Sequence, residues 1–76
     1  MKFAIEKIST HLTDATKDEY ALSQNVGGAA YVAVCFGTSD ECLRELYNRA
    51  KTANVNEVAV LFNGKENTYN VDNGIF

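Results

Sequence analysis

One amphipathic segment, Thr38 to Ala53, constrains the fold of this chain more than any other feature. Apolar side chains recur along it at helical spacing, while charged and polar side chains occupy the opposite side. Thr38-Ser39-Asp40-Glu41 has the pattern of a capping box, and Asn54 is a residue type that commonly ends helices. The segment therefore predicts one helix with one face to bury. That face comprises Cys42, Leu43, Leu46, Tyr47, Ala50 and Ala53.

Strand patterns flank the predicted helix on both sides. Lys2–Ile8 alternates, with Phe3 and Ile5 on one face. The alternation of Tyr20–Val26 favours a strand, although residues 13–22 could instead form a helix. The apolar run 29–36 between glycines predicts a central strand, and residues 57–62 predict a further one.

The dipeptide Asn63-Gly64 predicts a hairpin after the last of these strands. A two-residue turn would place Val60 opposite Asn67, whereas a four-residue loop, 63–66, would place Val60 opposite Tyr69. Because the longer loop pairs apolar with apolar side chains, we expect the longer loop.

Together these elements predict a single α+β domain, residues 1–76, with element order β-β-β-α-β-β. An antiparallel sheet of four to five strands carries the helix on one face. A chain of 76 residues supports one hydrophobic core, and 46% hydrophobic with 22% charged residues is typical of a globular protein.

Composition also limits where the protein acts and what it binds. No apolar stretch is long enough for a membrane span, and Glu6 interrupts the start before a signal-peptide core could form. We therefore expect a cytoplasmic protein without membrane association. The net charge of −3 disfavours direct binding to DNA and is more compatible with a protein partner.

The residues that could carry catalysis are few. Two cysteines and one histidine cannot complete a four-ligand zinc site. Cys42 belongs to the apolar face of the helix, so we expect a buried thiol and not a nucleophile. Strand alternation places Val32, Val34 and Phe36 toward the helix and Cys35 away from it, which argues against a disulfide. We therefore expect no catalytic residue, no metal, no cofactor and no enzymatic activity.

One helix covers only one side of a sheet, so the other side, called the open face here, is a candidate contact surface. Tyr31 and Leu61 are the largest side chains that alternation places there. Alternatively, the segment 10–25 folds over this face, and the apolar end 74–76 also lacks an obvious site. The full expected set is Tyr31, Ala33, Cys35, Ala59, Leu61, Thr68 and Asn70.

The segment Gly28–Phe36, followed by a helix and a strand, resembles the second half of an RNA-recognition motif over about half of the chain. Such domains stack bases on two exposed aromatic rings and carry a basic residue before the glycine. Here Tyr31 is the single candidate ring, and no basic residue precedes the glycine. Arg44 and Lys51 lie on one helix face, so single-strand RNA binding is an alternative function.

In size, acidity and strand-helix-hairpin layout the chain resembles small phage and mobile-element proteins that inhibit bacterial defence enzymes, anti-CRISPR proteins among them. The resemblance implies a non-enzymatic inhibitor acting in the host cytoplasm on a protein partner, such as a nucleic-acid-binding defence complex. It would act by steric occlusion or by acidic mimicry of nucleic acid. A structural homodimer is a further alternative. The carboxylates expected to be exposed for mimicry are those of Asp14, Asp18, Glu19, Asp40, Glu41 and Glu45.

Overall fold

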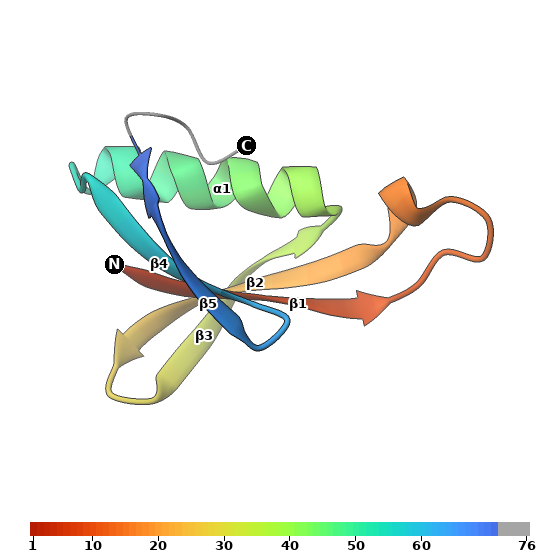
Figure 1. The fold of residues 1–76 in the computed structure, drawn as a ribbon, viewed down its shortest axis with the longest axis horizontal. Coiled ribbons are helices and arrows are strands. Elements are labelled where there is room, and N and C mark those ends of the chain that lie inside the picture. The colour runs from red at the N-terminus through yellow and green to blue at the C-terminus, as the bar shows by residue number, and fades with distance from the viewer. Residues whose placement is uncertain (72–76) are drawn as a thin grey trace.

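Five strands form one sheet, and a single α-helix lies across one of its faces, in the part of the chain that this computed structural model describes, residues 1–71 (Figure 1). The predicted α+β class and element order are confirmed; the apolar end 74–76 lies outside the described residues. The elements are β1 (Lys2–Ser9), a 3-10 turn η1 (Ala15–Lys17), β2 (Glu19–Gly27), β3 (Ala30–Gly37), α1 (Ser39–Thr52), β4 (Glu57–Phe62) and β5 (Lys65–Asn70).

The sheet is mixed, with strand order β3-β2-β1-β4-β5. Phe3 lies opposite Val60, and Ile5 opposite Phe62, in a parallel pairing of β1 with β4, whereas the other three pairings are antiparallel. The expectation of a wholly antiparallel sheet is therefore wrong at this one pairing. Helix α1 carries the chain from β3, at one edge, to the far side of β1, and such a crossover joins strands that run in the same direction.

The helix begins and ends as its sequence predicts. The Thr38 hydroxyl accepts a hydrogen bond from the Glu41 backbone N–H at 3.3 Å, and the Glu41 carboxylate accepts one from the Thr38 backbone N–H at 3.0 Å. This completes the capping box. Asn54, with φ of 58°, takes the left-handed conformation that follows many helix ends.

The hydrophobic core lies between α1 and the face of the sheet that it covers. Its helix residues come from the predicted apolar stripe, and Phe3 and Ile5 share the covered face of β1 as expected. Ala53, at the end of the predicted stripe, is exposed as the C-cap. The buried core comprises Phe3, Ile5, Leu22, Cys42, Leu46, Ala50, Val58, Val60 and Val71.

Strand β3 lies at an edge of the sheet, so its predicted central position is wrong. The register between β2 and β3 shifts after Leu22, which lies opposite Cys35, because Ser23 lies opposite Ala33 and leaves Val34 as an extra residue. A bulge of this kind reverses the alternation beyond it. As a result Cys35 faces the helix and Phe36 faces away, the opposite of the prediction.

The hairpin between β4 and β5 has the shorter of the two turns considered. Val60 lies opposite Asn67, so the expected four-residue loop is wrong. Asn63 and Gly64 both have positive φ, 49° and 88°, as a two-residue type I′ turn requires. The Asn63 backbone N–H also donates to the Ile5 carbonyl at 3.0 Å, which fixes the turn against β1.

The segment between β1 and β2 leaves the open face uncovered. The strand prediction for residues 20–26 is confirmed. The preceding residues extend past the end of the sheet (Figure 1), and Leu12 among them is 99% exposed. The alternative in which residues 10–25 cover the open face is therefore wrong.

Candidate functional site

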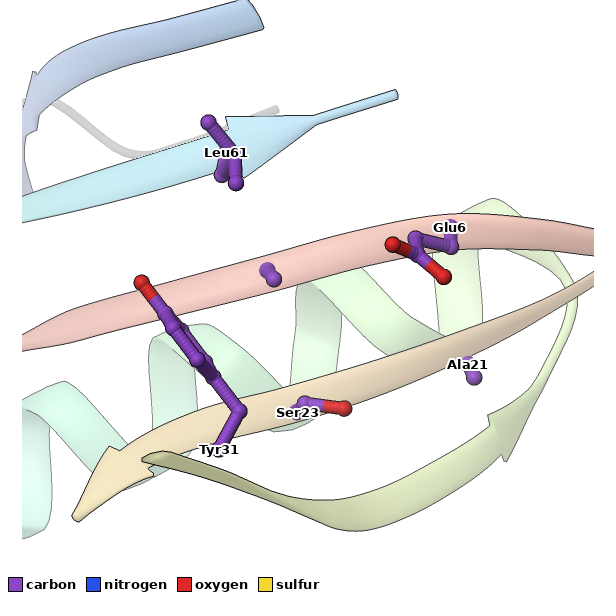
Figure 2. A pocket seen from close by; sticks show the side chains of 6 residues that line it. Glu6, Ala21, Ser23, Tyr31 and Leu61 are labelled. Atoms are coloured by element: carbon purple, nitrogen blue, oxygen red, sulfur yellow. The ribbon is translucent and has the colours of Figure 1, made fainter. Parts of the chain in front are cut away.

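The open face contains a shallow hollow of about 300 Å³ over the middle of the sheet. Small side chains on the adjacent strands β1 and β2 form its floor, since Ala4 lies opposite Ser23. Tyr31 on β3 and Leu61 on β4 stand at its two sides, and Figure 2 shows the Tyr31 ring reaching over β2 toward β1. The hollow is lined by Ala4, Glu6, Ala21, Ser23, Tyr31 and Leu61.

Charged groups border this hollow. Lys2 on β1 forms an ion pair with Glu66 on β5, with 2.9 Å between Nζ and Oε1. The hydrogen bond and charge of Glu66, and to a smaller extent the Tyr31 hydroxyl, raise the pKa of Lys2 above its usual 10.5. Glu6 contributes a carboxylate to the lining. An apolar centre with a polar border is the usual composition of a protein-binding patch.

The structure brings together the two side chains selected from the sequence, Tyr31 and Leu61, although they come from strands separated by β2 and β1. Strand register also places Ala33, Ala59, Thr68 and Asn70 on the open face. Cys35 is not part of it.

Sequence reasoning missed Phe36. It lies opposite Ala21, one of the residues lining the hollow, and is 61% exposed. The bulge at Val34 turns its ring to the open face, and nothing in the residues 30–37 themselves signals where the bulge falls.

Asp18 is buried, which corrects the prediction that its carboxylate is exposed. It is 4% exposed and accepts hydrogen bonds from the His11 backbone N–H at 2.7 Å and from Lys7 Nζ at 3.4 Å. The His11 hydrogen bond, with the Lys7 charge, lowers the pKa of Asp18 although burial acts against it. Asp14 caps the 3-10 turn by accepting from the Thr16 backbone N–H at 3.0 Å.

The acidic residues of α1 are largely engaged within the domain. The backbone and side-chain hydrogen bonds with Thr38 lower the pKa of Glu41. Glu45 forms an i,i+4 ion pair with Arg49, at 3.2 Å. Asp40 is exposed, as Glu41 is. With Asp14 and Asp18, four of the six carboxylates proposed for mimicry therefore have partners inside the domain.

The side chain of Cys42 belongs to the hydrophobic core, and that of Cys35 packs against it. Cys42 is fully buried, and its Sγ lies 3.6 Å from the Tyr20 carbonyl oxygen. Burial, with a smaller contribution from neighbouring Cys35, raises the pKa of Cys42 to about 11. Both cysteines are free thiols. A thiol with so high a pKa is protonated at neutral pH and is a poor nucleophile.

Within residues 1–71, no group of three or more histidine, cysteine, aspartate or glutamate side chains is arranged to hold a metal ion. No helix of that range is long and apolar enough to cross a membrane. No protein-family model, curated protein or solved structure matches this chain.

Proposed function

We propose that this domain is a non-enzymatic protein-binding module whose contact surface is the open face of the sheet. The observation that carries the proposal is the hollow between Tyr31 and Leu61, with the exposed ring of Phe36 on the same face. Interface centres are enriched in aromatic side chains that fill or border pockets, and tyrosine adds a hydroxyl for a polar contact.

Within this class the proposal is an inhibitor that acts by steric occlusion, in line with the resemblance to small anti-defence inhibitors. A five-stranded sheet backed by a helix presents a preorganised surface, so little ordering of side chains opposes binding. Steric occlusion is favoured over acidic mimicry because four of the six candidate carboxylates are already hydrogen bonded or ion paired within the domain.

The test starts from affinity capture in the native host and continues as a titration with the purified partner. Leu61→Lys places a charge in the hollow and should weaken binding by at least about tenfold, equivalent to ~1.4 kcal/mol. Asn48→Lys, an exposed position on the helix, is the matched control and should leave the affinity unchanged. Far-ultraviolet circular dichroism confirms that both variants fold.

Ionic strength separates the two mechanisms. Contact through the open face should tolerate salt, whereas acidic mimicry should weaken steeply as salt is added. Charge reversal at the exposed residues Glu19 and Asp40 is the second comparison, because it should lower the affinity only if the domain acts by acidic mimicry. Unchanged affinity in Leu61→Lys and in Tyr31→Ala would exclude the open face as the contact surface.

Binding of single-strand RNA is a second candidate, and one observation favours it. Phe36 joins Tyr31 on the open face, so two aromatic rings are available for base stacking where the sequence indicated only one. Glu6 and Glu66 oppose it, because their carboxylates lie on the same face and repel phosphates. Filter binding with mixed oligonucleotides at low salt tests this candidate, and no retention of RNA would exclude it.

A further inference from the structure

The two edges of the sheet differ sharply in charge. Strand β5, at one edge, begins with Lys65 and Glu66, and charged side chains of this kind protect an edge from pairing with another strand. Strand β3, at the other edge, carries no charge at all. No charged side chain occurs anywhere between Glu19 and Asp40, so β2 beyond its first residue and the turn before β3 are neutral as well.

Exposed apolar side chains gather along this neutral edge. Val32 is 52% exposed and lies opposite Gln24, whose side chain bonds to Arg49 of α1, so Val32 is on the helix side. Phe36, 61% exposed, is on the open face. Val26 at the end of β2 is 63% exposed. Strand β3 therefore exposes an apolar side chain on each side of the sheet, and its outer backbone N–H and C=O groups suit an added strand.

We propose that the β3 edge pairs with β3 of a second copy of this chain, antiparallel and about a two-fold axis. Self-complementarity points to a second copy as the occupant: β3 is apolar and uncharged, so pairing it with itself sets apolar against apolar side chains and brings no charged side chains of β3 together, although the chain carries a net −3. A two-fold axis at Val32 sets Val32 against Val32 of the second copy and Tyr31 against Ala33 of the second copy. Apolar side chains then meet on both faces.

This arrangement has a consequence for the open face. Since residues directly opposite each other in a sheet point to the same side, both helices lie on one side of the ten-stranded sheet that results, and both open faces lie on the other. The two hollows then lie on the same side of the sheet, one on each side of the axis, and each Tyr31 ring stays over the hollow of its own copy. Self-pairing thus builds one contact surface from two, independently of whether the open face binds a protein partner.

The dimer should form only at elevated concentration. The paired segment is short, because the extra residue Val34 interrupts regular pairing along β3, and small interfaces are weak. Sedimentation velocity of the whole chain, from micromolar to millimolar concentration, should show a reversible monomer–dimer equilibrium. Amide chemical shifts should change with concentration along β3 and not along β5.

Val32→Lys is the discriminating variant, because it sets two like charges against each other at the axis and should weaken dimerisation at least about tenfold. Asn67→Lys places the same charge at the exposed β5 edge and should leave the dimer intact. A monomer at millimolar concentration overturns the proposal. A dimer that persists in Val32→Lys also overturns it. Loss of the dimer in Asn67→Lys or Leu61→Lys does the same, since each of these results places the contact elsewhere.

Discussion

Replacing Leu46 by alanine should remove much of the stability of this domain. Leu46 is fully buried at the centre of the only α-helix in the described residues, where it faces the core between α1 and the sheet. Truncating a buried leucine to alanine costs about 3–5 kcal/mol, because transfer free energy is lost and a cavity remains. At ~0.05–0.15 kcal/mol per residue, a chain of 76 residues has a free energy of unfolding of roughly 4–11 kcal/mol. The substitution therefore removes about a quarter or more of it.

Leu12→Ala is the matched control, because it removes the same atoms from a side chain that is 99% exposed. It should change the free energy of unfolding by no more than about 0.5 kcal/mol. Urea titration followed by far-ultraviolet circular dichroism measures both variants. With an m value of ~1 kcal/mol per M, the Leu46→Ala midpoint should fall by about 3 M or more. Equal effects of the two substitutions would refute the placement of the helix on the sheet.

Three further outcomes can be measured with the same material. Thr38→Ala should cost about 1 kcal/mol by urea titration and Thr38→Ser much less, because serine retains the capping oxygen. The pKa of Asp18 is lowered from 3.8, so its contribution to stability is present above that value and lost as the pH falls through the lowered pKa; Asp18→Asn should flatten the dependence of the urea midpoint on pH over this acidic range. In native protein at neutral pH, a thiol reagent should label half-buried Cys35 first and Cys42 only after unfolding. Rapid labelling of both cysteines would contradict the burial of Cys42.

The secondary structure could be predicted because its signals are local. The capping residues, the apolar stripe of the helix and the alternation of β1 each depend on neighbours within a few positions, and all are found in the structure. The placement of Tyr31 and Leu61 on the open face succeeded for the same reason, since each lies on the expected side of its own strand.

The failed predictions concern how one segment pairs with another. Apolar matching favoured the longer hairpin loop, but the backbone preference of Asn63-Gly64 for a two-residue turn decided the register. Asp18 was assigned to the surface as an isolated charge, whereas its hydrogen bonds to His11 and Lys7 compensate its burial.

The sequence by itself determined most of the helix and strand segments and where the helix starts and stops, whereas the structure was needed to show that residues 10–25 leave one face of the sheet uncovered. Only the tertiary structure decided what that face contains. The bulge at Val34 arises from the fit of β3 to β2, and it exchanges Cys35 for Phe36 on the open face. The side on which a strand residue lies depends on every residue before it in the pairing, so one inserted residue changes the surface without changing the local pattern.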